Sequence, residues 1–353
     1  MMVEDIDHMS SDLLERYKRT VYSKWGKRLI FCQLILQEIV FWLSIIGKSI
    51  RSGLYYYITF NKKHLVKDIR YSDNKPRNVC DIYSPAAFDP NNNDGSKLYP
   101  VLLFVHGGSW AFGDKIQYIL MGKVLAEAGI VCMVVNYTLY PKGLIDDMLV
   151  DLDNAVKYCY ENIHLYGGDK HNIHLAGHSA GAHIITLFSC TRYLNNAIKS
   201  NKTNTSKDIV GSKVKSIVAL SGPFEISDHF IHETTRGLEH LSPMRPCMKG
   251  PKYFDFYSPT CIFDKVEDKS IDCNQFPKLY LLHGGQDKTV PLSSSIKLHG
   301  VLSKKLDDKS NVIFKNYPPI QHIELMFNLM DYDHDFRKDL INICKNNDIL
   351  LMK

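Results

Sequence analysis

Apolar runs of strand length alternate with segments of helical periodicity along most of this chain of 353 residues. The predicted strands are Val79–Tyr83, Val101–Val105, Val131–Tyr137, Ile173–Ala176, Val214–Leu220, Lys278–Leu282 and Val312–Tyr317. Ile145–Ile163 and Ala180–Leu194 are two of the helices predicted between them. Strands that are apolar along their whole length need cover on both faces, and alternating helices provide it. The sequence therefore predicts an α/β fold with a mostly parallel central sheet and helices on both faces.

One long insertion, about 223–275, separates two of the predicted strands. It mixes aromatic residues such as Phe224, Phe230 and Tyr257 with residues typical of turns. An apolar insertion at the carboxyl end of a parallel sheet is well placed to roof a ligand pocket. We predict a small cap at 223–275 within one large domain, residues 71–353, that carries the chemistry.

Residues 1–70 lack this alternation and are predicted to form a separate hydrophobic, helical segment. The run Leu29–Ile46 is mostly apolar, and Gln33, Gln37 and Ser44 fall on one narrow face of a helix. Three interpretations stay open: a helix packed on the protein's own core or lid, a helix in a membrane interface, and a membrane-spanning anchor. Membrane association through residues 29–50 is therefore one expectation.

Charge and cysteine content argue against several other classes of protein. The 43 Lys and Arg residues exceed the 38 Asp and Glu residues by only five. No dense Lys/Arg stripe accompanies this balance, so we expect no nucleic acid partner. The nine cysteines are an odd number and include no CxxC pair. This pattern indicates reduced thiols in an intracellular compartment and predicts no metal site.

The segment Gly177–Gly181 reads Gly-His-Ser-Ala-Gly and lies between a predicted strand and a predicted helix. In this context it predicts a nucleophile elbow, a turn so tight that the serine adopts a strained backbone conformation. Small residues must flank the serine, because a Cβ at Gly177 or Gly181 would clash with a neighbouring strand or helix. The turn raises the Ser179 hydroxyl above the sheet and directs a helix N-terminus at it. We predict Ser179 as the catalytic nucleophile.

A glycine pair follows the predicted strand Val101–Val105. A serine that transfers an acyl group needs N–H donors for the oxyanion that develops on the substrate. Glycines let backbone N–H groups approach that oxygen without obstruction by side chains. We predict that the N–H groups of Gly107, Gly108 and Ala180 form this oxyanion hole. The alternative is a plain turn after the strand.

The residues around the glycine pair receive separate predictions. Ser109 is a further candidate for the oxyanion hole, and Ser109 and Trp110 are expected to contact the substrate. Trp110 could instead be an anchor in the core. His106 closes a strand before a glycine loop, so we expect it to hold loops together by hydrogen bonds and not to act as the base.

A serine nucleophile of this type needs an acid and a base that follow it in the order Ser, Asp, His. Asp287 lies just past the predicted strand Lys278–Leu282, and His322 lies in the loop after the last predicted strand. Both positions can reach toward Ser179, so we predict that Asp287 orients His322 and stabilises its charged form. The alternatives are a turn carboxylate that caps the next helix, for Asp287, and a helix-capping or surface role, for His322.

These motifs together resemble the α/β-hydrolase superfamily, in the branch with an HGGxW oxyanion motif that includes the hormone-sensitive-lipase-like esterases. The resemblance runs from about Tyr71 to Phe327. The segments that carry it include Pro76–Tyr83, His106–Trp110, Tyr166–Asp169, Gly177–His183, Phe256–Pro259, Asp287 and His322. Within the branch the chain looks most like the isoprenylcysteine methylesterases and the apicomplexan esterases that activate ester prodrugs, and somewhat less like the kynurenine formamidases. By this resemblance Ser179, Asp287 and His322 match the triad positions.

The resemblance implies an α/β-hydrolase fold and a serine carboxylesterase that works through an acyl-enzyme without metal or cofactor. Its expected partner is a small-molecule or lipidated ester, with a prenylcysteine methyl ester as one candidate. The expected location is intracellular, at the endoplasmic reticulum or another membrane, or alternatively in the cytoplasm. An arylformamidase and a catalytically silent ligand-binding protein on the same fold are the alternative functions. The oligomeric state stays open.

Overall fold

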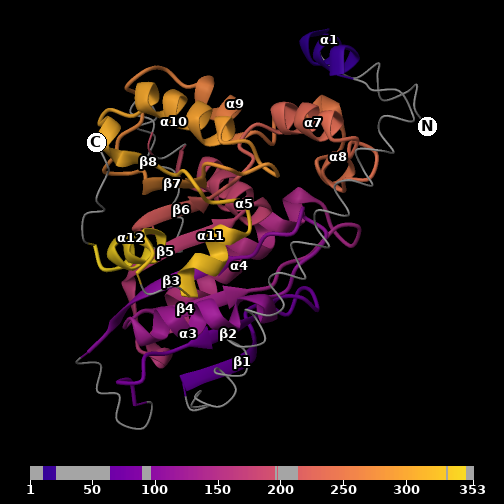
Figure 1. Cartoon of the computed structure of the whole chain (residues 1–353). Coiled ribbons are helices and arrows are strands. Elements are labelled where there is room, and N and C mark those ends of the chain that lie inside the picture. Colours follow the sequence, from indigo (N-terminus) through magenta and orange to yellow (C-terminus); the bar gives the residue numbers. More distant parts are fainter. Residues whose placement is uncertain are drawn as a thin grey trace.

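An eight-stranded sheet forms the centre of the computed structural model, which describes residues 11–20, 64–89, 97–194, 197, 214–330 and 333–346 (Figure 1). The strand order is β1-β2-β4-β3-β5-β6-β7-β8. The strands are β1 (Leu65–Arg70), β2 (Val79–Tyr83), β3 (Tyr99–Val105), β4 (Val131–Val135), β5 (Gly168–His178), β6 (Ser216–Leu220), β7 (Lys278–Gly284) and β8 (Val312–Tyr317). β1 and β2 pair antiparallel, β2 pairs antiparallel with β4, and all pairs from β4 to β8 are parallel. The predicted mostly parallel sheet is therefore confirmed.

Helices cover both faces of this sheet. Successive side chains of a buried strand point to opposite faces, so each buried strand contributes to two hydrophobic cores. In β3, Leu103 belongs to one hydrophobic core, and its neighbours Leu102 and Phe104 belong to the other. The first core includes residues of α4 (Ile145–Asn162), α5 (Ala180–Ser189) and α10 (Ser293–Lys305), and the second includes residues of α3 (Ile119–Glu127) and α12 (Asp335–Cys344). The predicted two-sided cover is confirmed.

The edge strand β1 lies in the region that the sequence assigned to a separate N-terminal segment. Its sequence, Leu-Val-Lys-Asp-Ile-Arg, has no continuous apolar run, and most of its residues are exposed or half-buried. An edge strand needs little burial, so hydrophobic periodicity does not reveal it. β1 therefore joins the sheet although it precedes residue 71, and the division of the chain into residues 1–70 and 71–353 stays a prediction.

Three helices follow β6 and precede β7 in the insertion where the sequence predicted a cap. They are α7 (Ile226–Thr235), α8 (Met244–Cys247) and α9 (Pro259–Asp264). Figure 1 shows the first described helix, α1 (Ser11–Thr20), beside α7. The Tyr17 ring stacks on Phe230 of α7 at 5.9 Å, and Arg16 donates a hydrogen bond to Asp228. The N-terminal helix is therefore docked on the insertion.

The apolar run Leu29–Ile46 lies outside the described residues, so its three interpretations stay predictions. Within the described part of the chain, no helix combines the length and the apolar character needed to cross a bilayer.

Candidate active site

Ser179 is the single residue between the end of β5 and the start of α5. Its backbone has φ 55° and ψ −121°, a conformation that residues with a side chain rarely adopt. Strain of this kind persists where the surrounding structure holds it, as at active sites. Here the Ser179 N–H donates to the Leu220 carbonyl of β6 at 2.8 Å. The local turn thus has the geometry of a nucleophile elbow.

The two glycines of the elbow stand where other parts of the chain come close. A Cβ added at Gly177 would lie 2.6 Å from the carbonyl oxygen of Gly181, and a Cβ at Gly181 would lie 2.2 Å from the Val105 carbonyl oxygen of β3. Backbone atoms cannot give way at such distances. The predicted need for small residues at both positions is therefore confirmed.

Asp287 and His322, which are 35 positions apart in the chain, meet in the structure. Asp287 Oδ2 lies 2.6 Å from His322 Nδ1, and both side chains are at least nine-tenths buried. Asp287 Oδ1 accepts the N–H groups of Thr289 at 2.9 Å and Val290 at 2.8 Å. Each oxygen of this carboxylate therefore has a partner in the protein, which orients the group.

The electrostatic environment keeps Asp287 ionised. Burial by itself raises the pKa of this carboxyl, but the adjacent His322 and His283 rings outweigh burial and hold the pKa well below its ordinary value. A carboxylate at this place keeps the proton of His322 on Nδ1 and leaves Nε2 free to accept another proton.

His322 lies beside the elbow. The rings of His322 and His178 are 4.6 Å apart, and His178 Nε2 lies 3.0 Å from the His322 carbonyl oxygen. Among the described residues, no hydrogen bond joins the Ser179 hydroxyl to the His322 ring. In free enzymes this contact is often long and shortens only when substrate binds.

The loop after β3 packs directly against the nucleophile. A Cβ at Gly107 would lie 3.1 Å from Ser179 Cβ. Gly108, Ser109 and Trp110 follow with φ of 119°, 47° and 59°, so three successive residues have positive φ. The Gly108 carbonyl accepts the N–H groups of Ala111 and Phe112, which closes the turn.

One predicted oxyanion donor has another partner. The Gly107 N–H donates to the Tyr118 hydroxyl at 3.4 Å. Within the described part of the chain, the N–H groups of Gly108, Ser109 and Ala180 donate to no acceptor. The three N–H groups are therefore available to a substrate oxygen, and the assignment of the oxyanion hole stays a prediction.

Trp110 is buried in the core, with 2% of its surface exposed. Its Nε1–H donates to His183 Nδ1 at 3.2 Å, so the proton of His183 is on Nε2, which lies 2.7 Å from the Tyr257 carbonyl oxygen. The ring therefore packs in the core, and its expected substrate contact stays a prediction, as does that of Ser109, which is exposed at the turn.

His106 is buried, and its expected role in holding loops together by hydrogen bonds stays a prediction. Burial lowers its pKa to about 4, so the ring is neutral. His106 Nδ1 lies 2.7 Å from the Gly107 carbonyl oxygen, and the ring stacks on Tyr137 at 4.5 Å.

The sequence motifs assign no role in the site to His283, Tyr118 or His178. His283 Nδ1 lies 2.7 Å from Ser295 Oγ, and its Nε2 lies 3.0 Å from the Val290 carbonyl oxygen and 3.4 Å from Asp287 Oδ2. Histidines beside the motifs were a visible signal, but their partners are distant in sequence.

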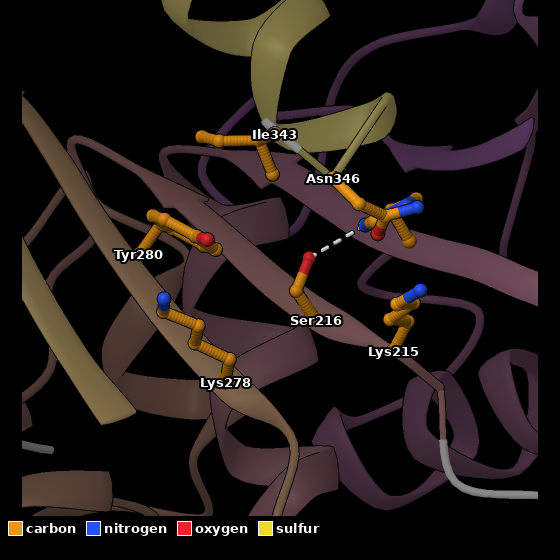
Figure 2. Close-up of a pocket in the computed structure, with 7 residues that line it drawn as sticks. Lys215, Ser216, Lys278, Tyr280, Ile343 and Asn346 are labelled. Carbon is orange, nitrogen blue, oxygen red and sulfur yellow. Dashed lines mark hydrogen bonds between the residues drawn. The ribbon is translucent and has the colours of Figure 1, made fainter. Parts of the chain in front are cut away.

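A cavity of about 210 Å³ lies elsewhere on the molecule (Figure 2). Its lining includes Ser216 and Lys278, the first residues of β6 and β7, with Lys215 and Tyr280 beside them. It is therefore at the amino ends of these strands, whereas Ser179 follows the carboxyl end of β5. The cavity is not part of the candidate active site.

A sequence model of the BD-FAE family matches residues 80–302. The chain belongs to the BD-FAE family. The BD-FAE match includes Ser179 and Asp287 and ends before His322.

Two plant proteins are similar to this BD-FAE member. The probable isoprenylcysteine alpha-carbonyl methylesterase ICME of Oryza sativa subsp. japonica is 30% identical over 303 residues, which are 85% of this chain and 69% of that protein. The isoprenylcysteine alpha-carbonyl methylesterase ICME of Arabidopsis thaliana is 35% identical over 240 residues, which are 68% of this chain and 52% of that protein. The chain thus spans about two thirds of the first relative and half of the second.

Esterase B from Lactobacillus Rhamnosis (HN001) is similar in structure, with a TM-score of 0.59 and 16% sequence identity over 91% of this chain and 95% of that chain. At this identity the likeness shows the fold alone. The predicted α/β-hydrolase fold and the family resemblance are confirmed for this BD-FAE member, and its esterase relatives bear out the predicted class, a carboxylic ester hydrolase.

Proposed function

We propose that this chain hydrolyses carboxylic esters with Ser179 as nucleophile, His322 as general base and Asp287 as its orienting acid. The observation that carries the proposal is the 2.6 Å contact of Asp287 Oδ2 with His322 Nδ1 beside a strained serine elbow. A turn-capping role alone would explain why Asp287 Oδ1 accepts two backbone N–H groups. It would not explain why Asp287 Oδ2 contacts the ring of His322.

The proposed reaction has two halves. His322 Nε2 accepts the Ser179 proton as the hydroxyl oxygen attacks the ester carbonyl, and the resulting imidazolium protonates the leaving alcohol as the C–O bond breaks. Water then attacks the acyl-enzyme with the same imidazole as base, and the acid leaves as Ser179 regains its proton. Asp287 stays ionised throughout and stabilises the imidazolium.

We assign the oxyanion hole to the N–H groups of Gly108, Ser109 and Ala180. The positive φ of Gly108 and Ser109 turns successive N–H groups in a direction that an ordinary strand end does not offer. Ala180 opens α5, so its N–H has no partner inside the helix. Each such donor contributes roughly 3 kcal/mol to the stabilisation of a tetrahedral intermediate.

The substrate that we propose is hydrophobic, with a prenylcysteine methyl ester as the first candidate. The names of the plant relatives support this choice, and so do the aromatic side chains of the insertion between β6 and β7. We further propose that residues 29–50 associate with a membrane, where such a substrate would reside. Binding of the full chain to phospholipid vesicles in a flotation assay tests the second point.

Active-site labelling tests the nucleophile. A fluorophosphonate probe is expected to label the protein and to leave Ser179→Ala unlabelled, with circular dichroism confirming that the variant is folded. Labelling that persists in Ser179→Ala would contradict the assignment. Hydrolysis of a prenylcysteine methyl ester is then compared with that of short p-nitrophenyl esters and of N-formylkynurenine. A strong preference for either of the latter two would replace the proposed substrate.

A further inference from the structure

We propose that His178, the residue before the nucleophile, positions the general base through a hydrogen bond to the backbone of His322. This inference rests on the proposed function, because it concerns the same active site. His178 Nε2 lies 3.0 Å from the His322 carbonyl oxygen, and the two rings are 4.6 Å apart. A positioning residue of this kind acts on the reaction only through the base.

The protonation state of His178 follows from its surroundings. A carbonyl oxygen only accepts hydrogen bonds, so Nε2 must carry the proton. Burial, the larger cause, and the neighbouring His322 lower the pKa of His178 to about 3, so the ring is neutral over the whole working range. His178 is therefore a permanent neutral donor and takes no part in proton transfer at ordinary pH.

The bond from His178 adds to the contacts that hold the loop of His322, among them the Gln286 N–H, which donates to the Ile320 carbonyl at 2.9 Å. His322 lies between the end of β8 and α11 (Glu324–Phe327), with no strand or long helix to hold it. The carboxylate of Asp287 fixes the ring at Nδ1, but one hydrogen bond leaves the ring free to tilt. The bond from His178 fixes the backbone of the same residue, so the ring and its anchor point are held separately.

His178 also contacts the other two parts of the site. It is joined to Ser179 in the chain, and its carbonyl oxygen would lie 2.9 Å from a Cβ at Gly107, in the loop after β3. The same residue therefore touches the loop of the base, the elbow and the loop of the oxyanion hole. A displacement of about 1 Å between such parts costs on the order of a hundredfold in rate.

Two substitutions separate the hydrogen bond from packing. In His178→Gln an amide N–H can still reach the His322 carbonyl, whereas His178→Met fills a similar volume without a donor. We expect His178→Met to lower kcat on a p-nitrophenyl ester by about 10- to 100-fold at little change in KM. His178→Gln should keep kcat within about fivefold of the wild type. The rate of fluorophosphonate labelling should follow kcat, because it reports the same activated serine.

His174 provides the matched control. It is a buried neutral histidine on the same strand, with its pKa lowered to about 4, and its Nδ1 lies 2.7 Å from Ser216 Oγ. His174→Met should lower the melting temperature without lowering kcat, since His174 lines the cavity at the amino ends of β6 and β7. Assays are run at least 10 °C below the lowest melting temperature.

Equal kcat in His178→Met and His178→Gln would overturn the proposal, and so would a loss in His178→Met no larger than that in His174→Met. If His178→Met does not fold, His178→Asn replaces it, because its shorter amide cannot reach the carbonyl. Activity that survives in Ser179→Ala would refute the proposed function itself, whatever the His178 variants do.

Discussion

Replacing Asp287 with Asn tests whether this carboxylate sets the tautomer of His322. The neighbouring backbone N–H groups determine the orientation of the new amide. Asp287 Oδ1 accepts two backbone N–H groups, from Thr289 and Val290, so the amide oxygen must stay on that side. The amide NH2 then faces His322 Nδ1, where the carboxylate oxygen now lies at 2.6 Å.

A hydrogen-bond donor at that place changes the tautomer of His322. Nδ1 must accept the amide proton, so the proton of His322 moves to Nε2, which can no longer accept the Ser179 proton. The same change in a serine hydrolase triad costs on the order of 10⁴-fold in kcat, which corresponds to about 5 kcal/mol in the activation barrier. We expect a loss of this size in Asp287→Asn, with the hydrogen bonds to Oδ1 retained and the circular dichroism spectrum unchanged.

Initial rates on a p-nitrophenyl ester and the rate of fluorophosphonate labelling both measure the loss. Asp308→Asn is the control, because Asp308 is an exposed carboxylate that accepts the Ser310 N–H at 2.8 Å in the turn before β8. Its kcat should equal that of the wild type. A kcat of Asp287→Asn within tenfold of the wild type would refute the tautomer argument and leave Asp287 as a turn residue.

Three further predictions concern the surroundings of the site. In Tyr118→Phe the buried Gly107 N–H loses its acceptor, so we expect the free energy of unfolding to fall by about 1–3 kcal/mol. Urea unfolding measures this loss, and an unchanged midpoint would contradict the prediction. Lys115→Met leaves Asp81, now 2.6 Å from the Lys115 ammonium and 2% exposed, as an uncompensated buried charge. Urea unfolding should show a loss of about 3–5 kcal/mol, and a loss below 1 kcal/mol would contradict this. Because the pKa of Asp287 is depressed in the folded protein, its stabilisation is present above the unfolded value of about 4 and decreases as pH falls below it. The gap in urea midpoint between wild type and Asp287→Asn should therefore narrow from pH 6 to pH 3, and a constant gap would count against the depressed pKa.

The central sheet could be predicted because its buried strands are continuous apolar runs in the sequence. β3 and β4 are apolar at nearly every position, and both their faces are covered. β1 escaped prediction because an edge strand with Lys67, Asp68 and Arg70 satisfies its neighbours by backbone pairing, which leaves no pattern in the side chains. The amino-terminal part of β5 was missed for a similar reason, since polar residues such as Asp169 and Lys170 precede its apolar run.

Some features of the site depend on residues nearby in the sequence, and others depend on residues that are distant in the sequence. The elbow at Ser179 depends on residues one or two positions away, so the five-residue pattern was enough to predict its shape. The choice of oxyanion donors depends on where each N–H points. Gly107 and Gly108 look alike as glycines, but Tyr118, eleven positions later, supplies the hydroxyl that accepts the first N–H. A glycine pair predicts that the backbone can approach the substrate, and not which of its N–H groups remains available.

His178 illustrates the distant case most clearly. The His178 side chain, one residue before the nucleophile, contacts a loop that is distant in sequence. That loop carries His322, 144 positions later, so the side chain lies against the proposed base. Because β5, β7 and β8 are neighbours or near neighbours in one parallel sheet, their carboxyl ends bring all three loops to one edge. The topology therefore places residue 178 next to the loop of the proposed base. Whether residue 178 only packs against this loop or also holds the base in place depends on whether its side chain carries a hydrogen-bond donor.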